Sequence, residues 1–354
     1  MKPISKLFFM AVTASLFLTS CSEDEAPVVA PLGDYEKGTF VLNEGNSNPT
    51  TATVTFLGDN GTIEENVFGT VNPTAEGLGS YLQSMFFADD KALILSGSAN
   101  KVTVVNRYTF KYITTISTNL ENPRYGAVVN GKAYITNYAD YSTGADDFLT
   151  VVDLTSFATT KIQLNNWSEK ILESNGKLYI ANGYYGSGNS ITVYNPATGA
   201  TEAVIDLGAG NSPNSFEVKD GILYVLTANY GTPGKIIKIS LSTNQIASTV
   251  DIPASISGPK QLNLDEDKLY FTAGTSVYSM GRVSTVVPTT PVVTYTSTSA
   301  WGQMYGFEVR NGKVFIADGG DFASDSKVYQ YATSGALLNT YTVGVGPNGF
   351  YFNN

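Results

Sequence analysis

The side chains of this chain that could do chemistry are carboxylates, aromatics and amides, because the 354 residues include no histidine and a single cysteine. Histidine is the usual general base and the usual zinc ligand, so Ser-His-Asp and Cys-His catalysis within the chain are excluded. One cysteine allows no intrachain disulfide and no cysteine-rich metal site. We therefore expect a protein that holds a molecule without changing it, with no catalytic residue and no cofactor.

Two groups of aspartates are the strongest exception to that expectation. They are Asp140, Asp146 and Asp147 in one stretch, and Asp318, Asp321 and Asp325 in another. Their oxygens suit calcium, but neither spacing matches a calcium-binding loop, so no metal site is predicted. Carboxylates can also act in pairs as acid and base, although none recurs at a fixed place in the chain. A metal-dependent hydrolase or lyase therefore stays an alternative.

A set of aromatic, amide and basic residues is better suited to binding. Tyrosine and tryptophan offer broad contact area at low entropic cost, and amides orient a ligand, so such a set fits a large, flat or sugar-like molecule. The candidate ligand-binding residues are Tyr81, Arg124, Tyr125, Trp167, Tyr184, Tyr185, Asn214, Tyr230, Lys260, Trp301, Gln303 and Asn348.

An internal repeat of about 45 residues must position these side chains. Residues 130–137 (Asn-Gly-Lys-Ala-Tyr-Ile-Thr-Asn) recur closely at 175–182 and more loosely further along the chain. The aromatic anchors of the repeat, which we expect to pack between units, are Tyr134, Tyr179, Tyr224, Tyr270 and Phe315. Two weaker copies upstream, at 38–43 and 90–94, bring the number of units to seven.

Each unit predicts four short antiparallel strands. A short apolar strand meets an Asn-Gly or Asp-Gly hairpin turn, the aromatic strand follows, and two further strands complete the unit. This pattern is typical of a propeller blade, and no helical periodicity is evident. Residues 346–352 match 212–218, the first strand of the fifth unit, whereas the first unit lacks such a strand. We predict an all-β, seven-bladed β-propeller of four-stranded antiparallel blades over 38–354, closed by the C-terminal strand completing blade 1.

The N-terminus predicts secretion and a lipid anchor. Lys2 and Lys6 precede an apolar run over 7–18, too short to span a bilayer comfortably. The run ends in Leu-Thr-Ser-Cys, which resembles a bacterial lipobox, so we predict a signal peptide over 1–20 and lipidation of Cys21. An ordinary signal peptide with a coincidental cysteine is the alternative.

Residues 21–37 then form an acidic, proline-containing tether. Its Ser-Glu-Asp-Glu start resembles the export signal of lipoproteins displayed on the outer membrane, although acidic residues also suit any solvated tether. We expect an outer-membrane protein, exposed at the cell surface, that contacts the membrane only through its lipid. The net charge of −10 argues against nucleic-acid binding.

The repeats resemble a known family of propellers. Tyr-Ile-Thr-Asn at 134–137 and Tyr-Ile-Ala-Asn at 179–182 are similar to the Tyr-Val-Thr-Asn repeat, over nearly the whole predicted mature chain. Phe-Val-Leu-Asn-Glu-Gly-Asn at 40–46, on a lipoprotein with an acidic tether, resembles seven-bladed surface lipoproteins that bind cobalamin over a TonB-dependent transporter. This resemblance implies capture of a nutrient, such as cobalamin or a related corrinoid, for that transporter. The alternative is a non-catalytic accessory propeller for adhesion or glycan uptake.

Overall fold

The computed structural model describes residues 30–353 apart from 185, 229–232, 298 and 300. It divides the chain into Met1–Pro31 and a compact unit, Leu32–Asn354, which holds all the strands. The predicted signal peptide and Cys21 lie outside the described residues, as do Tyr185 and Tyr230. No helix in the described part of the chain is long and apolar enough to cross a membrane.

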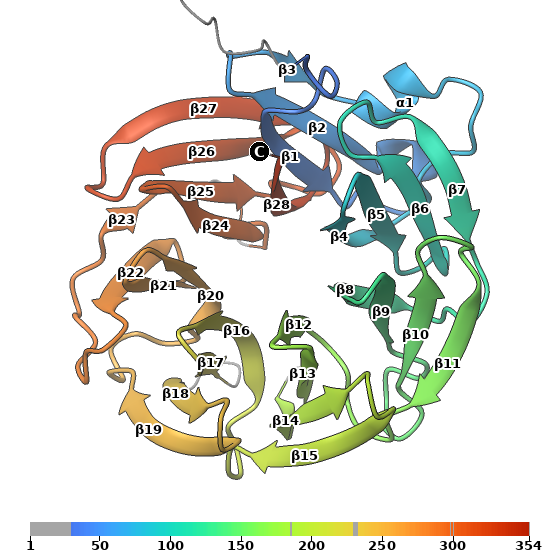
Figure 1. The fold of residues 1–354 in the computed structure, drawn as a ribbon. Helices are drawn as coiled ribbons and strands as arrows, with labels where there is room; N and C mark the ends of the chain where they lie inside the picture. Colours follow the sequence, from blue (N-terminus) through green and yellow to red (C-terminus); the bar gives the residue numbers. More distant parts are fainter. Residues whose placement is uncertain (1–29, 185, 229–232, 298, 300, 354) are drawn as a thin grey trace, which may run out of the picture. The chain divides into compact units, whose positions relative to one another are not determined.

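Seven four-stranded antiparallel sheets follow one another around a ring (Figure 1). Named from the innermost strand outward, the first four blades are β28 (Pro347–Asn353), β1 (Gly38–Asn43), β2 (Thr53–Gly58) and β3 (Ile63–Glu64); β4 (Leu82–Ala88), β5 (Lys91–Ser96), β6 (Lys101–Asn106) and β7 (Tyr112–Ile116); β8 (Pro123–Val129), β9 (Lys132–Asn137), β10 (Phe148–Asp153) and β11 (Thr159–Gln163); and β12 (Ile171–Ser174), β13 (Lys177–Tyr184), β14 (Ser187–Asn195) and β15 (Ala200–Asp206).

The last three blades have the same order. They are β16 (Pro213–Lys219), β17 (Ile222–Thr227), β18 (Lys235–Ser240) and β19 (Gln245–Asp251); β20 (Lys260–Asp265), β21 (Lys268–Ala273), β22 (Ser276–Gly281) and β23 (Val293–Thr294); and β24 (Gly306–Arg310), β25 (Lys313–Asp318), β26 (Ser326–Ala332) and β27 (Leu337–Val343). The predicted all-β, seven-bladed propeller is confirmed. A 3-10 turn (Pro49–Thr51) and α1 (Val67–Val71), which the sequence did not indicate, lie in blade 1 and its exit.

The hairpin turns of the repeat explain how each innermost strand is joined to the aromatic strand. Asn130, Asn175, Asp220 and Asn311 all have φ between +50° and +53°, and each is followed by a glycine with positive φ. Two consecutive left-handed residues form the turn whose twist matches that of the flanking strands. The repeated Asn-Gly and Asp-Gly pairs therefore set the register of the blades.

The ring closes through the C-terminal strand, as predicted. β28 pairs with β1 antiparallel, with Phe40 opposite Tyr351. The C-terminal strand is thus the innermost strand of the first blade, and β1 lies between β28 and β2 instead of at the edge of its sheet.

The aromatic anchors lie in the core between blades, as predicted. Tyr134, Tyr179 and Tyr224 are all buried. Tyr179 of β13 packs in one cluster with Phe216 and Leu223 of the next blade, so it joins two sheets. Burial at this repeated position holds neighbouring blades together around the axis of the ring.

Candidate ligand-binding channel

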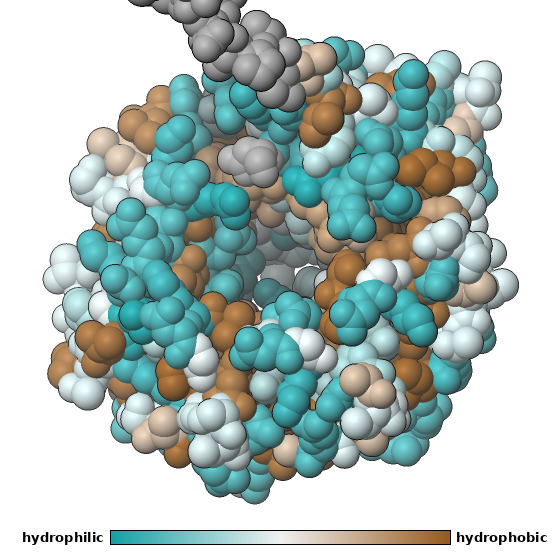
Figure 2. Space-filling model, viewed as in Figure 1, coloured by the Kyte–Doolittle hydropathy of each residue, from teal (hydrophilic) through white to brown (hydrophobic). Residues whose placement is uncertain are grey.

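A cavity of about 590 Å³ runs along the axis of the propeller, and Figure 2 shows the face hollowed at the centre of the ring. All seven innermost strands, or the residues just before them, contribute to its wall. Its volume lies within the roughly 300–1,000 Å³ of pockets that hold small molecules and cofactors.

The first layer of the channel, which we call the mouth ring, contains one polar side chain from each blade. It lies where the chain enters the innermost strands, and in five blades its member stands ten residues before the aromatic anchor. The repeat therefore places these side chains at one level. The mouth ring consists of Gln83, Arg124, Glu169, Asn214, Lys260, Tyr305 and Asn348.

Two deeper layers line the same cavity. Two residues after the mouth ring comes an apolar layer of Met85, Gly126, Ile171, Phe216, Leu262, Phe307 and Phe350. One residue further, four side chains form what we call the floor: Glu217, Asn263, Glu308 and Tyr351. The channel is thus polar at the mouth, apolar in the middle and acidic at the floor.

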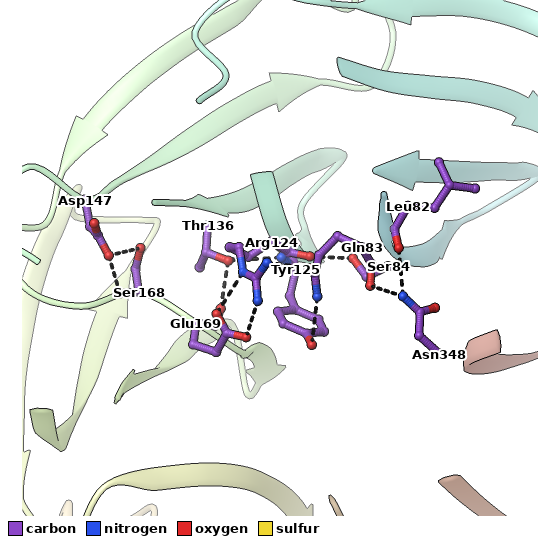
Figure 3. A network of polar contacts seen from close by, with 10 residues as sticks. All are labelled: Leu82, Gln83, Ser84, Arg124, Tyr125, Thr136, Asp147, Ser168, Glu169 and Asn348. Carbon is purple, nitrogen blue, oxygen red and sulfur yellow. Dashed lines mark hydrogen bonds and ion pairs between the residues drawn. The ribbon is translucent and has the colours of Figure 1, made fainter. Parts of the chain in front are cut away.

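Arg124 is held in a polar network at the mouth (Figure 3). Its Nε and Nη2 atoms donate to the two carboxylate oxygens of Glu169, each at 3.0 Å, and Nη1 donates to Gln83. The guanidinium carbon lies 4.8 Å from the ring centre of Tyr138. Burial alone would lower the pKa of Arg124, but the Glu169 carboxylate outweighs it and raises that pKa well above the usual range. Arg124 and Glu169 therefore neutralise each other.

Glu44, from the Asn-Glu-Gly segment after β1, also lines the cavity and contacts Tyr305 of the mouth ring. It accepts a hydrogen bond from the Tyr305 hydroxyl, and burial raises the pKa of its carboxyl although Tyr305, Arg124 and Asn348 oppose the shift. Gly45 follows with φ +73°, and a Cβ there would lie 2.6 Å from the backbone nitrogen of Ala52. Glycine is thus required where the chain turns Glu44 into the channel.

Burial also shifts the pKa values of Lys260 and of the floor carboxyls. Burial lowers the pKa of the Lys260 ammonium. Burial and the neighbouring Glu308 raise the pKa of Glu217 to about 8, and burial raises the pKa of Glu308 to about 7. Removal from water disfavours the charged form of each group.

The structure brings five of the predicted ligand-binding residues together in this cavity. They are Arg124, Tyr125, Asn214, Lys260 and Asn348.

The other predicted residues lie elsewhere. Tyr81 and Trp301 are exposed, at 43% and 86%, and neither lines the cavity. Trp167 is half-buried with its ring edge-to-face against Tyr138, and the Gln303 amide donates to a nearby backbone oxygen. Tyr184 ends β13 with a side chain outside the described set, like Tyr185 and Tyr230. The predicted aromatic platform is therefore not one continuous lining of the channel.

Several lining residues were not among the candidates. Gln83, Glu169 and Tyr305 of the mouth ring, and Glu217 and Glu308 of the floor, all face the cavity. The fixed offset of ten residues before each aromatic anchor would have found Glu169 and Tyr305, but not Gln83, because residue 93 is a leucine. No comparable signal marks the floor, because only some blades carry a polar residue there.

The aspartate stretches have structural roles. Asp140 and Asp321 each accept backbone N–H groups two residues ahead, and Asp318 accepts from the Tyr295 hydroxyl at 3.0 Å. Within the described residues, no three acidic, histidine or cysteine side chains gather as a metal-binding group would.

Asp147 makes stability depend on pH. It is fully buried, it accepts the Ser168 N–H at 2.8 Å, and burial raises its pKa to about 7. The unfolded chain ionises this carboxyl near pH 4 and the folded chain only near pH 7, so the wild type loses stability as pH rises between these values. We expect the stability of Asp147→Asn relative to the wild type to increase as pH rises through that window, measured by urea unfolding at several pH values.

Asp140→Asn is the matched control in the same loop. Asp140 is exposed, and its hydrogen bonds from Ser142 lower its pKa. The stability that Asp140 contributes to the fold is therefore lost only as pH falls. An Asp147→Asn profile parallel to that of the wild type from pH 4 to 7 would contradict the assignment.

Solved structures similar to this chain show the same fold at low sequence identity. A quinoprotein alcohol dehydrogenase-like protein from Bacteroides thetaiotaomicron has a TM-score of 0.66 and 16% identity, covering 90% of this chain and 79% of that one. A functionally unknown protein from Desulfotomaculum acetoxidans has a TM-score of 0.66 and 11% identity, covering 89% and 98%. BamB from Moraxella catarrhalis has a TM-score of 0.55 and 13% identity, covering 90% and 86%.

These likenesses establish the fold and leave the ligand open. No curated protein matches the chain in sequence. A family model described as a domain of unknown function, DUF5074, matches residues 37–315, which contain five whole blades and parts of the other two. The chain therefore belongs to the DUF5074 family.

Proposed function

We propose that this propeller is a binding protein that captures a polar nutrient at the mouth of its channel, without catalysis. The mouth ring carries the proposal: seven blades each contribute one polar or charged side chain at a single level over a cavity of about 590 Å³. Amides of Gln83, Asn214 and Asn348 beside Arg124 and Tyr305 offer donors and acceptors around an open centre. Convergent polar groups over an apolar layer are the usual form of a small-molecule site.

Cobalamin or a related corrinoid is the candidate ligand. Its support is the resemblance of residues 40–46 to surface lipoproteins that bind cobalamin, together with the place of Glu44 from that segment at the mouth. A corrinoid carries several carboxamide arms, which the amides of the mouth ring could bind, while its ring would rest on the surrounding face. With no histidine in the chain, no imidazole of this protein could coordinate the cobalt.

The proposed biological role is to pass the nutrient to a TonB-dependent outer-membrane transporter. It depends on the predicted lipidation of Cys21 and on the acidic tether that follows. Several acyl chains, at about 0.8 kcal/mol per buried methylene, would hold the propeller firmly at the membrane. Protease added to intact cells should degrade the propeller if it is displayed outside, and protection from protease would contradict surface display.

Titration of the full chain with cyanocobalamin tests the ligand. We expect saturable heat and a rise in the unfolding midpoint. Trp301 is the most exposed large hydrophobic side chain of the described residues, and Trp301→Ala should weaken binding about tenfold if the corrin ring stacks on it.

Tyr112→Ala is the matched control, since Tyr112 is an exposed aromatic residue on the outer strand β7. It should leave binding unchanged. The absence of both heat and a thermal shift with micromolar cyanocobalamin would exclude the corrinoid. Equal losses of binding in both variants would exclude Trp301 from the site.

A further inference from the structure

Lys260 and Glu217 line the channel at opposite levels without an ion pair or side-chain hydrogen bond among the described residues, whereas the lining ammonium of Lys170 lies over the Tyr125 ring. Lys260 lies at the mouth and Glu217 at the floor, and both residues are only partly exposed. Burial without a partner disfavours the charged form of each group, and an opposite charge on a ligand would restore it. Arg124 differs, because Glu169 already neutralises it.

These two charges lie on one wall of the cavity. β16, β20 and β24 are the innermost strands of consecutive blades and contact one another in turn. Lys260 begins β20, and Asn263 lies three residues further along it at the floor, between Glu217 of β16 and Glu308 of β24. Three residues along a strand span at most about 10 Å, which sets the distance between the two levels.

Side chains between and around the charges define the shape of the space. The apolar layer on this wall consists of Phe216, Leu262 and Phe307. Below it, the Asn263 amide donates to the Glu308 carboxylate while its oxygen accepts the Val309 N–H at 3.0 Å, so Glu308 is fixed in place. From mouth to floor, this wall therefore carries the Lys260 ammonium, the apolar layer, and the carboxyls of Glu217 and Glu308.

Other charges near the floor leave an anionic excess. Lys170 stabilises the ionised forms of both glutamates, Arg310 does so for Glu308, and Asp265 opposes it. Lys170 also lies over the Tyr125 ring, at 5.6 Å from its centre, on another part of the wall. Near the floor, the cations of Lys170 and Arg310 thus face three carboxyls, those of Glu217, Glu308 and Asp265.

We propose that the channel binds a linear zwitterion, with its anionic end at Lys260, its apolar middle against Phe216 and Phe307, and its ammonium end between Glu217 and Glu308. An ω-amino acid or a short peptide has this chemistry. The inference rests on the proposed binding role of the propeller but not on the corrinoid.

The probe is 8-aminooctanoate, whose extended chain spans roughly 10 Å. Octanoate and octylamine are half-probes that keep one charged end each. Titration calorimetry of the full chain should show 8-aminooctanoate binding about 10- to 100-fold more tightly than either half-probe, since each end adds a charged contact. A half-probe that binds as tightly as the zwitterion overturns the proposal.

Variants assign the two ends. Lys260→Met should weaken the binding of 8-aminooctanoate about tenfold or more and leave the binding of octylamine unchanged. Glu217→Gln should also weaken the binding of 8-aminooctanoate but leave the binding of octanoate unchanged. Matched controls are Lys313→Met and Glu121→Gln, which alter exposed residues away from the cavity and should change nothing. Equal losses for all three probes in either channel variant would overturn the assignment.

The same samples titrated with cyanocobalamin separate this inference from the proposed ligand. Heat with 8-aminooctanoate alone supports the zwitterion site and excludes the corrinoid. Heat with cyanocobalamin alone overturns the zwitterion site and leaves nutrient capture intact. Heat with neither overturns both.

Discussion

Replacing Tyr179 by alanine is expected to destabilise the propeller by about 3–5 kcal/mol, the range for deleting a buried aromatic side chain. Tyr179 is 1% exposed and packs in one cluster with Phe216 and Leu223 of the following blade. Its loss leaves a cavity between two sheets that cannot collapse without moving a blade. Urea unfolding of the variant and the wild type, at one pH, measures the difference.

Tyr112→Ala serves as the control for this prediction too. Tyr112 is 42% exposed on the outer strand β7, so its removal should cost far less than removal of Tyr179. Equal unfolding midpoints for Tyr179→Ala and the wild type would show that the repeat anchors do not hold the blades together.

Arg124→Met is expected to cost about 3 kcal/mol, because it leaves the Glu169 carboxylate in the channel wall without its counter-charge. The side chains of Arg124 and Glu169 are only 18% and 15% exposed, and both oxygens of Glu169 accept from the guanidinium. Breaking one side of a buried ion pair is worse than replacing both. The double variant Arg124→Met/Glu169→Met should therefore recover much of the lost stability, measured as a double-mutant cycle.

The surface pair of Lys177 and Glu202 provides the matched comparison. Its side chains are about a third exposed, and the two charged atoms lie 2.6 Å apart. Lys177→Met should cost far less than Arg124→Met, as expected for an ion pair in contact with water. A loss as large as that of Arg124→Met, or no recovery in the double variant, would contradict the buried-pair account.

Much of the fold could be predicted because the repeat carries it locally. Asn-Gly and Asp-Gly pairs impose left-handed turns, and an aromatic residue at a fixed place after each turn must be buried. The closing strand was predictable for the same reason, since residues 346–352 resemble other innermost strands. The short helix α1 lies in the one connection where the repeat is weakest.

The site was predicted less completely. Arg124, Asn214, Lys260 and Asn348 were found because polar residues preceding an innermost strand stand out in the sequence. Trp301 was predicted because it precedes an innermost strand and does not recur in each unit, yet it is exposed and does not line the channel. Glu217 and Glu308 were missed, because nothing local distinguishes a glutamate facing the axis from one facing solvent.

The sequence by itself determined the number of blades, their turns and the absence of histidine and disulfide chemistry. These follow from residue types and from contacts within a repeat, which are short-range. Only the tertiary structure decided which charges meet. Arg124 and Glu169 are 45 residues apart and belong to different blades, as do Glu217 and Glu308. Closing the ring brings equivalent positions of every repeat to one axis. Partial burial there disfavours a charge that has no partner.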